Sequence, residues 1–69
     1  MLDSVKGDNI LVKLKPFEGD RITVSGKLTA FDMHLNMWLE DAKMKDAESE
    51  THFGKLLIRG DNVTVVSPE

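Results

Sequence analysis

Residues 21–33 have the sequence RITVSGKLTAFDM, in which apolar and polar side chains alternate until the pattern slips at Phe31. Alternation with a period of two predicts a β-strand with one buried face. The side chains expected on that face are Ile22, Val24, Leu28 and Ala30. A strand usually has about 3 to 10 residues, so one of this length must bend, and Gly26 has no side chain to hinder the bend. The segment therefore predicts a strongly curved sheet, as in small β-barrels.

Four further strands are predicted on either side of this segment. They cover residues 9–15, 37–44, 53–59 and 63–66. Gly54 offers the fourth strand a second bend point. The preceding residues 2–6 are long enough only for one helical turn, which Gly7 would end. We therefore expect an all-β fold, a single domain over residues 1–69, with a small, strongly bent five-stranded antiparallel sheet forming a partly open barrel of the SH3-like or OB-like class.

Turn-forming residues separate the predicted strands and bring consecutive strands side by side. The first hairpin loop contains Pro16, Phe17, Glu18, Gly19 and Asp20. Such residues are typical of tight connections rather than linkers. Residues 45–51 are polar and acidic and predict the tip of a second hairpin. A third turn is expected at residues 60–62, before the last strand.

Composition narrows the class of protein. Ile, Leu, Val and Phe make up 20 of the 69 residues, which is too apolar for intrinsic disorder. A chain of this length buries only a small core, so help from a partner subunit is expected. There is no cysteine, no apolar run long enough to span a membrane and no recognisable signal segment, so we expect a cytoplasmic location. The net charge of −3 argues against broad binding of duplex DNA, but a local pocket for single-stranded RNA needs only a few well-placed groups.

No arrangement of residues predicts catalysis. The four serines lie in no nucleophile elbow, the two histidines are too few for a histidine zinc site, and no glycine-rich phosphate loop precedes a helix. The carboxylates of the second half follow strand and hairpin spacing and match no calcium loop: Glu40, Asp41, Asp46, Glu48 and Glu50. A solvated face is the better interpretation. We expect neither an enzyme, nor a cofactor, nor a metal site.

Two motifs carry the functional prediction. The first is FDMHLN at residues 31–36, within residues 26–42, and the second is LIRGDNV at residues 57–63. In order and spacing they resemble the two motifs of the Sm and Sm-like (Lsm) proteins, and the brevity of the chain favours the archaeal type of that family. Together with the first strand, the resemblance covers nearly the whole sequence.

The resemblance implies a ring of six or seven subunits in which the fourth strand of one pairs with the fifth strand of the next. It also implies that each subunit binds one nucleotide of uridine-rich single-stranded RNA at the central hole. His34 and Arg59 would stack on the two faces of the base, and Asn36 would bind its Watson–Crick edge. Asp61 would accept a hydrogen bond from Asn36 or Arg59, and Gly60 would let the backbone approach the base or phosphate closely.

Alternatives remain for the ring and for single residues. The ring could act chiefly as a scaffold that binds proteins, with weak RNA binding, or include other Sm-like subunits. Without the motifs, His34 would be a loop residue, Asn36 a turn former, and Arg59 with Asp61 a surface ion pair. Trp38 is a packing residue or a platform for stacking on RNA or on a neighbouring ring.

Overall fold

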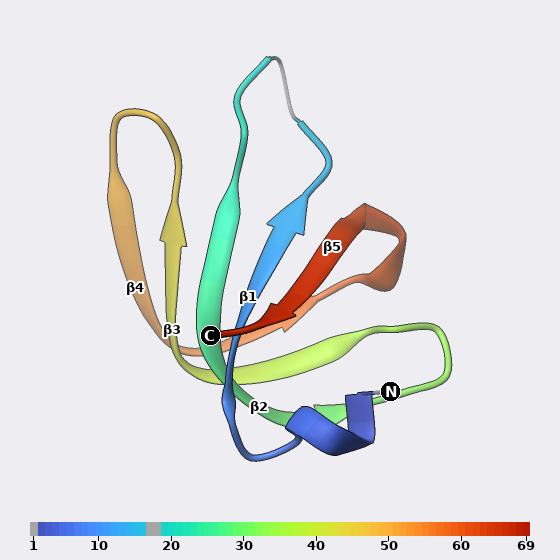
Figure 1. The fold of residues 1–69 in the computed structure, drawn as a ribbon. Coiled ribbons are helices and arrows are strands. Elements are labelled where there is room, and N and C mark those ends of the chain that lie inside the picture. Colours follow the sequence, from blue (N-terminus) through green and yellow to red (C-terminus); the bar gives the residue numbers. More distant parts are fainter. Residues whose placement is uncertain (1, 17–18) are drawn as a thin grey trace.

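A computed structural model describes residues 2–16 and 19–69 and shows one five-stranded antiparallel sheet with the strand order β4-β3-β2-β1-β5 (Figure 1). The elements in chain order are the 3-10 turn η1 (Leu2–Val5), β1 (Asn9–Leu14), β2 (Thr23–Phe31), β3 (Met37–Lys45), β4 (Glu50–Ile58), the 3-10 turn η2 (Gly60–Asn62) and β5 (Val63–Pro68). The predicted fold class is confirmed. β5 leaves β4 through η2 and pairs with β1, so β4 and β5 form the two edges of the sheet.

The strand boundaries differ from the prediction mainly in β2, β4 and β5, and β5 continues to Pro68, two residues further than expected. The long predicted strand is shortened at both ends to β2, which ends at Phe31 because Asp32 begins a turn in which Leu35 donates its N–H to the Asp32 carbonyl. β4 begins at Glu50, three residues earlier than expected. The second hairpin tip is compact because the Asp46 carboxylate accepts the N–H groups of Glu48 and Ser49 at 2.8 and 2.7 Å. The first predicted loop lies partly outside the described residues, at Phe17 and Glu18.

The predicted bend at Gly26 is confirmed. Figure 1 shows β2 curving strongly along its length, and the register between β2 and β3 shifts between Ser25 and Lys27. Opposite the shift, Asp41 adopts a left-handed backbone conformation with φ of 49°. A β-carbon on Gly26 would lie 3.1 Å from the Cα of Ala42, so the close approach of the two strands leaves little room for a side chain.

Nine buried apolar side chains form the core among the described residues: Leu2, Ile10, Val12, Val24, Leu28, Met37, Leu39, Ala42 and Ile58. One expected member of the buried face is wrong, because Ala30 is exposed. A second register shift between Leu28 and Ala30 places Ala30 opposite Trp38 and turns both away from the core. No helix among the described residues is long and apolar enough to cross a membrane.

Candidate nucleic-acid interface

An open depression of about 430 Å³ lies where the β2–β3 loop meets η2. It is lined by His34, Asn36, Arg59, Gly60 and Asp61. The two motifs are more than 20 residues apart, yet the fold brings these five predicted site residues together at one surface. The sheet achieves this because β3 and β4 pair up to Met37 and Ile58, so the segments beyond those two residues meet at the same end of the hairpin.

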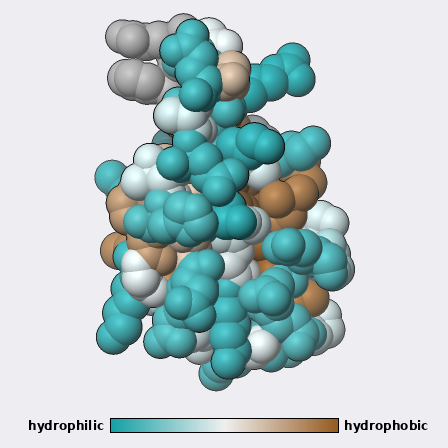
Figure 2. Space-filling model, turned by 90° about the vertical axis from the view of Figure 1, so that its left-hand side faces the viewer, coloured by the Kyte–Doolittle hydropathy of each residue, from teal (hydrophilic) through white to brown (hydrophobic). Residues whose placement is uncertain are grey.

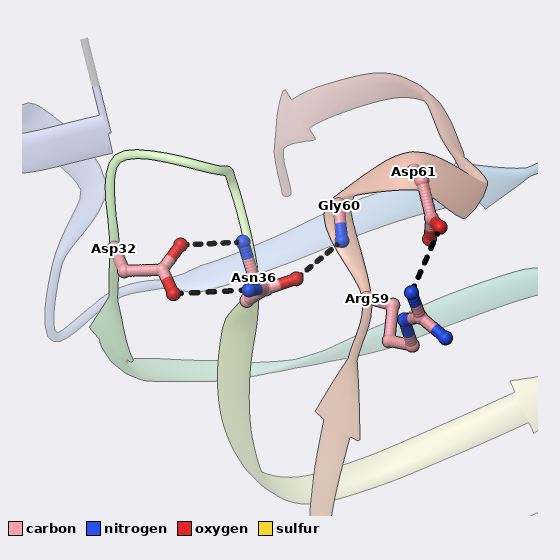
Figure 3. A network of polar contacts seen from close by, with 5 residues as sticks. All are labelled: Asp32, Asn36, Arg59, Gly60 and Asp61. Atoms are coloured by element: carbon pink, nitrogen blue, oxygen red, sulfur yellow. Dashed lines mark hydrogen bonds and ion pairs between the residues drawn. The ribbon is translucent and has the colours of Figure 1, made fainter.

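Asp32 holds the β2–β3 loop in shape from within. One carboxylate oxygen, Oδ1, accepts the backbone N–H groups of His34 at 2.9 Å and Asn36 at 3.0 Å. The other, Oδ2, accepts the side-chain Nδ2–H of Asn36 at 3.0 Å (Figure 3). Leu35, between them, adopts a left-handed conformation with φ of 63°, which costs a residue with a β-carbon about 1–2 kcal/mol. The hydrogen bonds to Asp32 offset that cost and fix the backbone positions from which the side chains of His34 and Asn36 extend.

Asn36 ties this loop to the second motif. Its Oδ1 accepts the backbone N–H of Gly60 at 2.8 Å, so the side chain bridges Asp32 and Gly60 (Figure 3). A carboxylate on one side can only accept and an N–H on the other can only donate. The orientation of the Asn36 amide is therefore fixed by its two partners. The contact with Asp32 uses one Nδ2 hydrogen and the contact with Gly60 uses one Oδ1 lone pair, which leaves one donor and one acceptor for a ligand.

Gly60 is required by the approach of the two loops. A β-carbon at this position would collide with the backbone carbonyl of His34 and crowd Leu35. The structure thus gives a reason for the glycine that the sequence did not provide, since the close neighbour is the β2–β3 loop itself. The backbone N–H of Gly60 is already bonded to Asn36.

Arg59 and Asp61 face each other across the start of η2. The Nη2 of Arg59 donates to Oδ2 of Asp61 at 3.1 Å, and both side chains are exposed. Of the two partners considered for Asp61, Arg59 is therefore the one found, whereas Asn36 is held by Asp32. An exposed ion pair adds little stability, so its effect is to restrict the guanidinium to the rim of the depression.

Sequence analysis missed Asp32 as a site residue, although it lies within the first motif. Its pKa is lowered from the usual range mainly by the side-chain hydrogen bond from Asn36, with further contributions from the N–H groups of Asn36 and His34. The carboxylate is therefore ionised at neutral pH and accepts all three bonds. The available signal was an Asp two residues before His34, which is the spacing of an Asx turn. Across residues 2–16 and 19–69, no three His, Asp or Glu side chains gather as a metal site would require.

Comparison with known proteins agrees with this architecture. The family model described as LSM domain matches residues 1–68. An snRNP Sm-like protein of Pyrococcus abyssi is 41% identical over 66 residues, covering 94% of this chain and 81% of the relative. One from Methanosarcina barkeri is 35% identical over 69 residues, covering 99% and 90%.

Two solved structures superpose closely. The SmAP1 heptamer of P. aerophilum has a TM-score of 0.86 and 34% identity, covering 99% of this chain and 86% of that one. The Pyrococcus abyssi Sm protein in complex with a uridine heptamer has a TM-score of 0.85 and 36% identity, covering 99% and 92%. The match of the family model over nearly the whole sequence, together with these relatives, shows that the chain belongs to the LSM domain family.

Proposed function

We propose that this chain forms a ring of six or seven copies that binds uridine-rich single-stranded RNA, with one nucleotide in each pocket. The observation that carries the proposal is the Asn36 amide, held on both sides in a depression lined by all five predicted contact residues. A heptameric relative and a relative bound to a uridine heptamer support the same function. The role is binding rather than catalysis, in RNA processing or as a ribonucleoprotein scaffold in the cytoplasm.

The fixed amide suits the edge of uracil. Uracil presents an N3–H donor beside a carbonyl acceptor, which matches the remaining acceptor and donor of Asn36. Cytosine and adenine carry the reverse order, a ring-nitrogen acceptor beside an amino donor. In the position that uracil would take, these bases would place an acceptor nitrogen against the amide oxygen of Asn36, and the amide could match them only by flipping and losing its bonds to Asp32 and Gly60. His34 and Arg59 would add stacking on the base, which contributes about 1–3 kcal/mol per base without selecting its identity.

Ring formation accounts for the two edge strands. β4 and β5 each pair on one side only within the chain, so their outer backbone groups lack a strand partner. Pairing β4 of one copy with β5 of the next would satisfy those groups and enlarge the small core. Because each pocket alone is weak, repetition around the ring would raise the effective concentration for a bound oligonucleotide. The net charge of −3 favours, as the second candidate, a ring that mainly scaffolds proteins and binds RNA weakly.

The test is the solution mass of the purified protein with and without oligo-uridine, with oligo-adenosine of equal length as control. We expect the mass of six or seven copies and selective binding of oligo-uridine. A ring that ignores both oligonucleotides would favour the scaffold. A stable monomer would contradict the ring.

A further inference from the structure

A tryptophan and a leucine are exposed side by side on the face of the sheet opposite the core, which we call the outer face. Trp38 on β3 lies opposite Leu57 on β4. The chain neighbours of Trp38, Met37 and Leu39, are buried, so its own side chain points away from the core. Trp38 is 42% exposed, Leu57 is 54% exposed, and both line a depression of about 440 Å³. A large exposed aromatic beside an exposed leucine indicates an interaction surface rather than a solvated face.

The outer face also carries a concentration of positive charge. Two residues along β3 and β4 from the exposed tryptophan and leucine, strand pairing sets Lys27, Glu40 and Lys55 in one row across β2, β3 and β4. Further rows toward the hairpin tips add more lysines. At its paired positions, among the described residues, the outer face carries two carboxylates, Glu40 and Glu50, and five exposed lysines: Lys13, Lys27, Lys43, Lys45 and Lys55. A chain with a net charge of −3 therefore has one face on which positive charge prevails.

The two lysines nearest in register to Trp38 are available to a ligand. In the part of the chain that the structure describes, neither Lys27 nor Lys55 forms an ion pair. Glu40 lies between them in the row, so two positive charges accompany one negative charge. Lys55 lines the same depression as Trp38. Seen from the β4 side in Figure 2, polar side chains lie between two flanks of apolar surface. Unpaired positive charge and an exposed aromatic ring thus adjoin on one surface.

We propose that the outer face is a second binding surface for single-stranded RNA, separate from the depression at Asn36. A base stacks on Trp38, and the adjoining phosphates contact Lys27 and Lys55. Basic side chains beside an aromatic platform are the combination that binds single strands without selecting the sequence. The charge favours this ligand over an apolar protein segment, because covering unpaired lysines with apolar atoms would strip water from their charges at a cost.

The proposed ring would leave this surface open. Edge strands that pair extend a sheet sideways, in the direction of the backbone hydrogen bonds, and do not cover its faces. The outer face of one copy would therefore continue into that of the next. Each stacking site alone is weak, but repetition along a bound strand would raise the effective concentration for the next contact. The inference goes beyond the proposed function, because it needs no contact at Asn36.

Trp38 is the only tryptophan, so its fluorescence reports on the outer face alone. Oligo-adenosine, which the proposed pocket disfavours, should quench Trp38 emission in the full chain, with an affinity that falls as salt rises. Lys27→Gln and Lys55→Gln should each weaken this binding at least about threefold. Trp38→Ala should weaken it at least about fivefold, measured by anisotropy of a labelled oligonucleotide. Lys6→Gln is the matched control, because it removes the same charge from an exposed residue outside the sheet and should have little effect.

The outcomes separate this surface from the pocket. Quenching by oligo-adenosine should persist in Asn36→Ala; if it is lost there, the signal arises in the pocket and the inference is wrong. Binding of oligo-uridine while neither oligonucleotide quenches Trp38 would overturn the inference and leave the proposed function intact. Shielding of Trp38 from acrylamide before any RNA is added would show that protein covers the outer face, which also overturns it. Quenching in the parent protein requires no variant to fold, so the inference can be tested even if every variant unfolds.

Discussion

The side-chain oxygen of Asn36 accepts the backbone N–H of Gly60 at 2.8 Å, across 24 residues of sequence. This bond joins the β2–β3 loop to the turn η2, while Asp32 holds the other end of the same amide. One side chain therefore both assembles the depression and presents a fixed donor and acceptor within it. Loss of Asn36 should affect two separate measurements, stability and base selectivity.

Asn36→Ala should lower the free energy of unfolding by about 1 kcal/mol, because the Gly60 N–H and the Asp32 carboxylate each lose a partner that water only partly replaces. The ratio of affinities for oligo-uridine and oligo-adenosine should fall toward one. Chemical denaturation and fluorescence anisotropy measure the two effects. Asn9→Ala, which removes an exposed side chain on β1, is the control and should change neither. Unchanged uridine selectivity in Asn36→Ala would show that another group recognises the base.

Arg59→Ala should weaken binding to uridine and adenosine oligonucleotides by similar factors, because stacking does not select the base. A loss of about 1 kcal/mol or more per nucleotide is expected. Arg21→Ala removes the same charge from a residue outside the depression and should have a much smaller effect. If the two arginine variants lose equal affinity, the contribution is general electrostatics rather than stacking at this site.

Gly60→Ala should disrupt the depression, since the added β-carbon collides with the carbonyl of His34. The strain should cost about 1–3 kcal/mol of unfolding free energy and abolish selective binding. Gly54→Ala is the matched control, because a β-carbon at Gly54 meets nothing within 4 Å. Thermal unfolding of the two variants under identical conditions checks the prediction, and equal stabilities would contradict the close approach of the two loops.

Acidification should loosen the β2–β3 loop. The pKa of Asp32 is lowered in the folded state, mainly by the Asn36 side chain, so the folded state favours the ionised form. Its stabilisation is fully present above the unfolded-state pKa, near 3.8, and is lost as the pH falls through the lower folded-state value. Asp32→Asn should remove this part of the pH dependence. In urea unfolding, the stability difference between the parent and Asp32→Asn should shrink as the pH falls below about 4; a constant difference would contradict it.

Asp46 should contribute acid sensitivity of the same sign at the other hairpin, because the N–H groups of Glu48 and Ser49 lower its pKa. Asp46→Asn is therefore a useful comparison. It should change stability with pH in the same direction while leaving oligonucleotide selectivity intact, because Asp46 lies outside the depression.

The sequence predicted the five strands and the bend at Gly26, because both depend on alternation and on one residue without a side chain. It misplaced Ala30 because a register shift reverses which side chains face the core, and no local pattern marks that shift. The five residues that line the depression followed from the two motifs. The roles of Asp32 and Gly60 did not, because they depend on how closely two loops approach in three dimensions.

The most direct test of the pocket compares the affinities of the purified protein for oligo-uridine and oligo-cytidine of equal length. The two bases have nearly the same size and differ mainly in the order of donor and acceptor on the edge that Asn36 would contact. A fixed amide predicts at least about tenfold tighter binding of oligo-uridine, from about 1–3 kcal/mol for each mismatched hydrogen-bonding edge. Equal affinities would show that Asn36 does not recognise the base through this edge.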